Sequence, residues 1–347
     1  MDGIDETAVS QWLAARLPEC DLPVSFELIA RGHSNLTFQI RDAGGRSYVL
    51  RRPPLAEVLS SAHDMTREHT VMSALGSTSV PVPHVFAACD DLAVAGAPFY
   101  VMSFVSGAVY PDQRTLSAAL PLESTVRASR DLVEVLAALH AVDPQSVGLA
   151  GFARPDGYIE RQLRTWLRQY SATADPSVSG VGALHDRLAA RVPVQQRSSI
   201  THGDYRLGNT MIGEDGMVGA ILDWELATLG DPLADLGWLL VTWRQAADDV
   251  QSAGHDLGLS TGFLEEDSAA GHYARLTGLD LSDLEFYLAF NYWRWACIMQ
   301  GVHHRYLAGA MGAGAAAGLP DFPSMLGWQL AQSQAHLDAY EEKRTAR

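Results

Sequence analysis

Lysine is almost missing from this chain of 347 residues: Lys343 is the only one, so every other basic residue is an arginine. Basic residues are scarce altogether, because 25 Lys and Arg stand against 41 Asp and Glu, and the formal net charge is -16. A protein that grips nucleic acid neutralises its phosphates with a basic face. The acidic balance holds for residues 1–110 as well as 111–347, and it excludes a nucleic-acid partner.

Cysteines are few, and long apolar runs are missing. Cys20, Cys89 and Cys297 lie far apart and in no Cys-x-x-Cys spacing, which favours reduced thiols over disulfides or metal ligands. Residues 307–319 are the most membrane-like, but this stretch is too short to span a bilayer and contains several glycines. Residues 1–6 carry three acids and no apolar core of a secretory signal. We expect a cytoplasmic protein without a membrane partner; the oligomeric state is not visible in the sequence.

The first hundred residues predict a small antiparallel sheet with one helix. Turn residues separate short apolar runs, which predicts strands at 26–29, 36–40, 48–50 and 99–105. Met65, Glu68, Met72 and Leu75 have helical spacing, and Gly76 follows as a stop signal, which predicts a helix over 61–75. The carboxylate of Glu68 is therefore expected on the inward face of that helix.

The rest of the chain predicts mainly helices. Leu132, Leu136 and Leu139 share one helix face, and Ile159, Leu163, Trp166 and Tyr170 share another. The composition, 47% hydrophobic, can bury a large core, and the length favours two lobes. We therefore expect an α+β protein with a sheet lobe over residues 1–105 and a helical lobe over 106–347.

One predicted β-hairpin interrupts the helical half. Its arms are residues 200–212 and 217–223, and the turn is Gly213 to Gly216. If Ile212 faces Met217, antiparallel counting places Asp223 opposite Arg206.

This register brings three oxygen-bearing side chains together. Asp204 and Asn209 lie in the loop that contains Arg206, and Asp223 lies opposite it. Carboxylate and amide oxygens suit Mg²⁺, which prefers one or two carboxylates plus substrate phosphates. The alternative is a polar turn in which Asp204 and Asn209 only form local hydrogen bonds.

The string His202-x-Asp204-x-x-x-x-Asn209, followed by Asp223, resembles the catalytic loop and metal-binding Asp of kinases. With Leu222-Asp223-Trp224-Glu225, it resembles the aminoglycoside phosphotransferase family of small-molecule kinases. The resemblance implies a bilobal protein-kinase-like fold with a cleft for ATP or GTP. It implies that Asp204 takes the proton of an acceptor hydroxyl and that Asn209 and Asp223 hold Mg²⁺. His202 is expected to anchor the loop rather than act as acid or base.

An arginine stands where kinases of this kind have a lysine. Tyr48-Val49-Leu50-Arg51 corresponds to the Val-Ala-Ile-Lys strand, so the resemblance implies that Arg51 reaches the nucleotide phosphates, with Glu68 as its partner. The alternative is a surface arginine at a strand end, with Arg52 equally eligible.

The resemblance implies further nucleotide contacts. Arg206 would steady the transferred phosphoryl group, although a solvated loop arginine is an equal alternative. Gly32, His33 and Ser34 would cover the phosphates, or form an ordinary hairpin turn. Ser103 and Val105 would read the adenine edge with backbone groups.

The sequence after the hairpin predicts a support for the catalytic loop. Asp231 and Pro232 have the pattern of a helix start, and Asp235 follows one turn later. We expect these acids to brace the loop rather than contact substrate.

The acceptor is less well defined. Gly230 to Trp238 and Arg51 to Pro54 are most similar to kinase domains fused to acyl-CoA dehydrogenases, which implies a hydroxyacyl or acyl-CoA acceptor. An acidic lobe would instead suit an aminoglycoside-like polyamine. Two groups of basic residues either bind the substrate or lie on solvated helix faces. The first group is Arg161, Arg164 and Arg168, and the second is Arg294, His303, His304 and Arg305.

Taken together, the sequence predicts a phosphotransferase that uses ATP and Mg²⁺ to phosphorylate a hydroxyl group of a small molecule. The alternative is a nucleotide-binding regulator that no longer transfers phosphate, which the missing lysine suggests.

Overall fold

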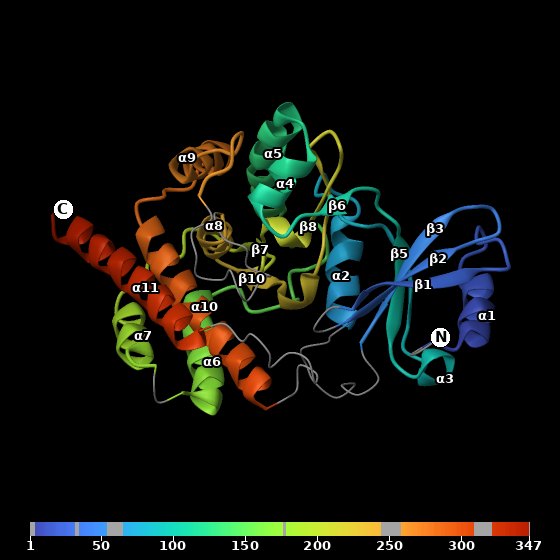
Figure 1. Ribbon diagram of the computed structural model, residues 1–347, viewed down its shortest axis with the longest axis horizontal. Coiled ribbons are helices and arrows are strands. Elements are labelled where there is room, and N and C mark those ends of the chain that lie inside the picture. Colours follow the sequence, from blue (N-terminus) through green and yellow to red (C-terminus); the bar gives the residue numbers. More distant parts are fainter. Residues whose placement is uncertain are drawn as a thin grey trace.

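The computed structural model describes residues 4–31, 35–53, 65–175, 178–243, 258–308 and 321–346. A β-sheet forms one end of the molecule and a group of helices forms the other (Figure 1). The sheet is antiparallel, with the strand order β1-β2-β3-β5-β4. Its strands are β1 Ser25–Arg31, β2 Leu36–Arg41, β3 Ser47–Arg52, β4 Val85–Cys89 and β5 Phe99–Ser103. The predicted small antiparallel sheet is thus confirmed, although β5 ends two residues earlier than expected.

Helices cover the two faces of the sheet. On the outer face lie α1 Glu6–Arg16, which the sequence analysis did not predict, and α3 Leu92–Ala95 (Figure 1). Trp12 of α1 packs edge-on against Phe99, with ring centroids 4.8 Å apart. The other face carries α2 Met65–Leu75, the described part of the helix predicted over 61–75. Glu68 lies fully buried on its inward face, as the spacing predicted.

The remaining helices form the second part of the molecule. They are α4 Gln113–Ala119, α5 Leu122–Ala141, α6 Tyr158–Thr173, α7 Val181–Ala189, α8 Pro232–Val241, α9 Glu266–Thr277, α10 Leu284–Leu307 and α11 Phe322–Thr345. The predicted stripe Leu132, Leu136 and Leu139 is fully buried. Helix α10 packs against α6, α8 and α11 and is the centre of this part. The observed elements agree with an α+β chain, while the lobe boundary at residue 105 stays a prediction.

Short strands lie between the sheet and the helices. They are β6 Ala108–Val109, β7 Ser199–Thr201, β8 Thr210–Ile212, β9 Val218–Ile221 and β10 Thr228–Gly230. Strand β8 pairs with β6 and β9, and β7 pairs with β10. The region from β7 to α8 therefore forms the join between the two parts of the molecule (Figure 1).

The hairpin β8–β9 has a different register from the predicted one. Ile212 pairs with Val218 rather than Met217, and a bulge then pairs Met211 with Ala220. The bulge falls at Gly219, where the side chain of Val105 lies close to the backbone. The prediction that Asp223 lies opposite Arg206 is wrong by two residues. One comes from the turn, which pairs Ile212 one residue further along, and the other comes from the bulge, which counting from a regular pairing pattern misses.

Among the described helices, none combines the length and the apolarity that a membrane crossing requires. All three cysteines are buried as free thiols.

An ion-pair cluster joins α10 to α11 and gives a pH-dependent stability. Glu285 accepts hydrogen bonds from His336, with 2.7 Å between Oε2 and Nδ1, and from the Nζ of Lys343 at 2.9 Å. The hydrogen bond from His336 and the charge of Lys343 lower the pKa of Glu285 to about 2. Because the carboxylate is partly exposed, we expect Glu285→Gln to cost about 1 kcal/mol of unfolding free energy near pH 5.

This loss should depend on pH in one direction. The lowered pKa of folded Glu285 means that the stabilisation is complete above the unfolded value of about 4.3 and is lost as pH falls towards about 2. Urea unfolding of both proteins across this range measures the difference. Glu342→Gln, at an exposed position of α11, is the control; a difference that stays constant with pH would contradict the expectation.

Candidate active site

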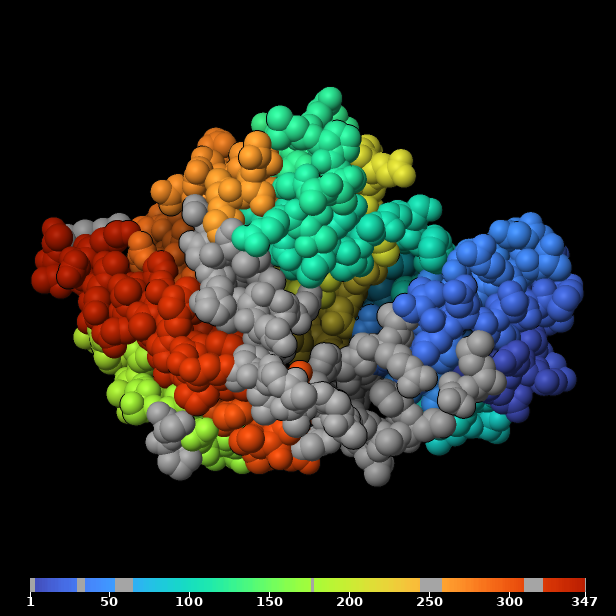
Figure 2. All heavy atoms as spheres, viewed as in Figure 1, coloured from blue at the N-terminus to red at the C-terminus, as the bar shows by residue number. Residues whose placement is uncertain are grey.

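A cavity of about 690 Å³ lies where the sheet meets the helices. Its lining includes Arg51 of β3, Asp204 and Asn209 of the loop after β7, and Asp223 and Glu225 after β9. Figure 2 shows a hollow in the surface between the sheet and the helices, with atoms of residues in the 200–240 range on its floor. Polar residues from distant parts of the sequence therefore share one cavity of a size that suits a small ligand.

The backbone of the loop after β7 is held by a buried carboxylate. Asp235 of α8 accepts hydrogen bonds from the backbone N–H of His202 at 2.6 Å and of Gly203 at 2.9 Å. Asp231 caps the first turn of α8 by accepting from Leu233 N, as the sequence predicted. Burial alone would raise the pKa of Asp235, but the hydrogen bond and charge of His140 outweigh it, and the pKa lies below the usual range. Asp235 thus braces the loop as an anion.

Two further residues fix the shape of this loop. Gly203 has a φ of +85°, and a Cβ atom there would lie 2.8 Å from the carbonyl oxygen of Leu226, so only glycine fits. His202 is fully buried and accepts from Asp204 N at Nδ1 (3.2 Å), which leaves Nε2 to donate to Leu222 O (2.9 Å). The expectation that His202 anchors the loop is consistent with both contacts.

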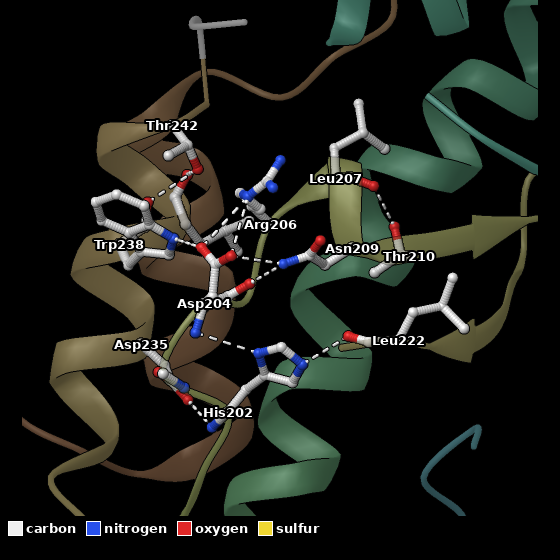
Figure 3. A network of polar contacts seen from close by, with 12 residues as sticks. His202, Asp204, Arg206, Leu207, Asn209, Thr210, Leu222, Asp235, Trp238 and Thr242 are labelled. Carbon is white, nitrogen blue, oxygen red and sulfur yellow. Dashed lines mark hydrogen bonds and ion pairs between the residues drawn. The ribbon is translucent and has the colours of Figure 1, made fainter. Parts of the chain in front are cut away.

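The carboxylate of Asp204 is surrounded by donors (Figure 3). Its Oδ1 accepts from Trp238 Nε1 at 2.6 Å, and its Oδ2 accepts from Asn209 Nδ2 at 2.7 Å. Arg206 Nε lies 3.3 and 3.4 Å from the two oxygens. Because the amide nitrogen of Asn209 is committed to Asp204, the Oδ1 of Asn209 is left as the acceptor of this side chain.

A buried ion-pair cluster stands opposite, on the sheet side. Arg51 Nε lies 3.3 Å from Glu68 Oε2, and Arg51 Nη2 contacts Asp223 Oδ1. Glu68 also accepts from Tyr100 Oη at 2.8 Å and from Asn35 Nδ2 at 3.3 Å. Burial alone would lower the pKa of Arg51, but Tyr100, Glu68 and Asp223 outweigh it and raise the pKa above the usual value. The predicted pairing of Arg51 with Glu68 is therefore present.

Arg52 points elsewhere. Its side chain is fully buried and donates to the carbonyl oxygens of Ala95 (2.5 Å) and Pro53 (3.1 Å). Of the two arginines that the sequence left equally eligible, only Arg51 lines the cavity.

Asp223 has an unusual backbone conformation. Its φ of 67° is left-handed, and among the described residues it is the only one other than glycine with a positive φ. Such strain is concentrated at functional sites, and Asp tolerates it better than most residues. One oxygen each from Glu68, Asp223 and Glu225 lie within 4.8 Å of one another. Glu68 is committed to Arg51 and Tyr100, so Asp223 and Glu225 are the carboxylates of this group that line the cavity and could hold a divalent cation such as Mg²⁺.

Of the residues expected to read the adenine edge and to cover the phosphates, only the first group can be placed. Ser103 and Val105 line the cavity, but the Ser103 N–H donates to His84 O at 2.8 Å and is therefore already committed. Gly32, His33 and Ser34 lie outside the described residues.

One basic residue is placed wrongly by the sequence analysis. Arg294, expected on a solvated helix face, is only 2% exposed and lies over the ring of Trp238. It belongs to a helix buried on several sides, where Trp293 and Trp295 are also in the core. Arg161 donates to the carbonyl oxygen of Arg154 at 2.7 Å and so binds its own loop.

Two partners of the site were not predicted from the sequence, Tyr100 and the indole of Trp238. Both lie in apolar runs that read as core, and only the fold brings their polar atoms to Glu68 and Asp204. Buried Tyr and Trp side chains need a hydrogen-bond partner, which is the one signal that could have marked them.

Comparison with known proteins agrees with this geometry. The sequence profile of the phosphotransferase enzyme family matches residues 25–274. Acyl-CoA dehydrogenase family member 11 of Gallus gallus is 36% identical over 318 residues, which cover 88% of this chain and 40% of that protein. The chain thus spans less than half the length of the curated relatives it matches.

Solved structures show the same relationship. A protein from Ralstonia eutropha, provisionally named an aminoglycoside phosphotransferase, is 33% identical with a TM-score of 0.80, covering 95% of this chain and 98% of that one. A thermostable mutant of an aminoglycoside phosphotransferase, solved with ADP and hygromycin B, shares the fold at 16% identity and a TM-score of 0.59, over 96% of this chain and 98% of that one. The chain therefore belongs to the phosphotransferase enzyme family, a family of small-molecule kinases, and has its bilobal, protein-kinase-like α+β fold.

Proposed function

We propose that the protein transfers the terminal phosphoryl group of ATP, in a Mg²⁺-dependent reaction, to a hydroxyl group of a small molecule. One observation carries the proposal: Arg51, Asp204, Asn209 and Asp223 line the same cavity although they come from three separate segments. Phosphoryl transfer needs positioned cations, a group that orients the attacking hydroxyl, and oxygen ligands for a metal ion. These four side chains supply all three.

Asp204 is the residue that would orient the acceptor. Its carboxylate is 23% exposed and lines the cavity, so a hydroxyl group can approach it. The donors Trp238, Asn209 and Arg206 hold it in one orientation. Asp204 would then accept the hydrogen bond of the acceptor hydroxyl and receive its proton as the oxygen attacks phosphorus.

The residues present also fit a magnesium ion. Asn209 Oδ1 and the carboxylate of Asp223 would hold it, and Glu225 adds a third oxygen donor nearby. When bound, Mg²⁺ neutralises and orients the phosphates of the nucleotide.

Arginines supply the protein's own positive charge. Arg51 lines the cavity and is already fixed by Glu68 and Asp223, so it can contact a phosphate without losing much side-chain freedom. Arg206 lies beside Asp204, where a cation would stabilise the transferred group. ATP rather than GTP stays a prediction, because it depends on the backbone at Ser103 and Val105.

The lining of the cavity bears on the acceptor. Among its described residues the carboxylates are Asp204, Asp223 and Glu225, all of which have a proposed role in catalysis or metal binding. On the side of the helices it reaches Ile298 of α10 and the cationic Arg206. An acceptor with an apolar portion and little positive charge, such as a hydroxyacyl thioester, fits this lining better than a polyamine such as an aminoglycoside. The names of the longer relatives point in the same direction.

Asp204→Asn tests the reaction. We expect kcat to fall by about 10²–10⁴ because the carboxylate no longer accepts the proton, while the Kd for ADP stays unchanged. Asparagine keeps an oxygen for Trp238, so the loop should stay folded. Turnover is measured as ADP release and binding by calorimetry, and Asp215→Asn in the exposed hairpin turn is the control. Nucleotide binding by the wild-type chain without turnover on any hydroxyl compound would instead identify a regulator.

Asp223→Asn tests the metal site separately. Asparagine tolerates the left-handed backbone, so the change removes a charge without adding strain. We expect the gain in ADP affinity on adding Mg²⁺ to fall by about 10–100-fold, whereas ADP without Mg²⁺ should bind as before. Calorimetric titration with and without Mg²⁺ gives both values. An unaltered response to Mg²⁺ would contradict the assignment.

A panel of acceptors tests the substrate class. Hydroxyacyl-CoA thioesters and aminoglycosides are compared for stimulation of ADP release, with Asp204→Asn as the blank. We expect turnover with the thioesters, because the described lining of the cavity has no carboxylate, apart from the three with assigned roles, that could bind several ammonium groups. Turnover of aminoglycosides alone would overturn this choice and leave the phosphotransferase activity itself intact.

A further inference from the structure

A tryptophan and an arginine lie behind the carboxylate of Asp204. Trp238 of α8 donates from Nε1 to Asp204 Oδ1 at 2.6 Å. Arg294 of α10 lies over the ring of Trp238, with its Cζ 4.5 Å from the ring centroid, and donates to the carbonyl oxygen of Gly203. Both side chains are almost completely buried, at 4% and 2% exposure. Arg294 therefore contacts the loop both at the residue before Asp204 and, through the indole, at the Asp204 side chain.

Trp238 differs from the other donors to Asp204 in its origin. Asn209 and Arg206 belong to the same loop as Asp204, so they move with it. Trp238 belongs to α8, and its rigid ring is packed edge-on against Trp295, with centroids 5.8 Å apart. A carboxylate has about four lone-pair positions, and Trp238 fixes one of them relative to the helices. Trp238 thereby sets the direction in which the remaining lone pairs of the Asp204 carboxylate face the cavity.

The charge of Arg294 has no carboxylate partner within ion-pair distance among the described residues. Its contacts are the carbonyl oxygen of Gly203, Asn291 Oδ1 at 3.5 Å, and the faces of Trp238 and Trp166. Within the described part of the chain, its Nε has no hydrogen-bond partner. A buried charge with only neutral partners is costly, and an apolar residue of similar size would pack at less cost. The positive charge over the ring, however, polarises the indole and makes its N–H a stronger donor to Asp204.

We propose that Trp238 and Arg294 are positioning residues that hold the Asp204 carboxylate in its reactive orientation. The effect on phosphoryl transfer rests on the proposed function, whereas the effect on the structure of the loop does not. Arg294 fixes the indole and the Gly203 carbonyl together, so the orientation of Asp204 follows the packing of α8 against α10.

Nuclear magnetic resonance of the indole groups tests this without turnover. The ¹⁵N-labelled full chain has eight tryptophans, and Trp238→Phe identifies the Trp238 signal by its loss. We expect Asp204→Asn and Arg294→Met each to move this signal upfield more than any other indole signal, and Arg294→Lys to move it less. Arg344→Met, which removes a cation from the face of Tyr340 on α11, is the control and should leave it in place. An unmoved Trp238 signal in folded Asp204→Asn and Arg294→Met would overturn the proposal.

Steady-state kinetics provide the second readout, measured with the acceptor that the panel described above identifies as a substrate. Trp238→Phe and Arg294→Met should lower kcat by about 10–100-fold with the KM for ATP unchanged, and Arg294→Lys should recover part of the loss. A raised KM for ATP with unchanged kcat would show that the two residues have only a structural role, and this result would also overturn the proposal. If no acceptor is turned over, the resonance shift still decides whether the two residues hold Asp204. Because methionine removes an unpaired buried charge, Arg294→Met is expected to fold even if Trp238→Phe does not.

Discussion

The contact of Arg51 with Glu68 and Asp223 is the interaction on which the site depends. The three residues come from β3, from α2 and from the segment after β9, so the cluster joins the sheet to the helical part at the cavity. Glu68 is fully buried, and removing one partner of such a pair typically costs about 3–5 kcal/mol because the other charge is left unpaired. An arginine can serve here because its planar fork spans two carboxylates, which the point charge of a lysine ammonium does less well. The missing lysine therefore does not leave the site without a cation.

A second buried carboxylate, that of Asp235, holds the loop after β7 in place, as Glu68 holds Arg51 of the sheet. Asp235 accepts two backbone N–H groups of the loop and contacts His140, whose other ring nitrogen lies 2.6 Å from Tyr273 Oη. The loop before Asp204 is thus bonded through α8 and α5 to α9. Every member of this chain is buried and hydrogen-bonded, which makes the position of the loop backbone costly to change.

Much of the fold could be predicted because its signals are local. Strand alternation and helical spacing gave the sheet and the inward face of α2, including Glu68, and the tight spacing from His202 to Asp223 marked the site. The bulge at Gly219 was not predicted, because counting residues back from the turn assumes regular pairing along both strands. Trp238 and Arg294 could not be assigned either, because their sequence neighbours are apolar and their roles arise only where α8 packs against α10. Local chemistry was therefore visible in the sequence, whereas the residues that orient it were not.

The connection from Asp223 to α8 is short. Only the turn Trp224–Leu226 and strand β10 lie between Asp223 and the helix start at Asp231. Arg67, next to Glu68 on α2, donates to Ala227 O at 2.8 Å and lies over the ring of Phe152. The helix that carries Glu68 is thus bonded directly to the segment that carries Asp223. In protein kinases the equivalent helix and Asp are brought into place by a longer activation segment and its phosphorylation. Here the two are joined by contacts of the folded chain, Arg67 with Ala227 and Arg51 with Glu68 and Asp223.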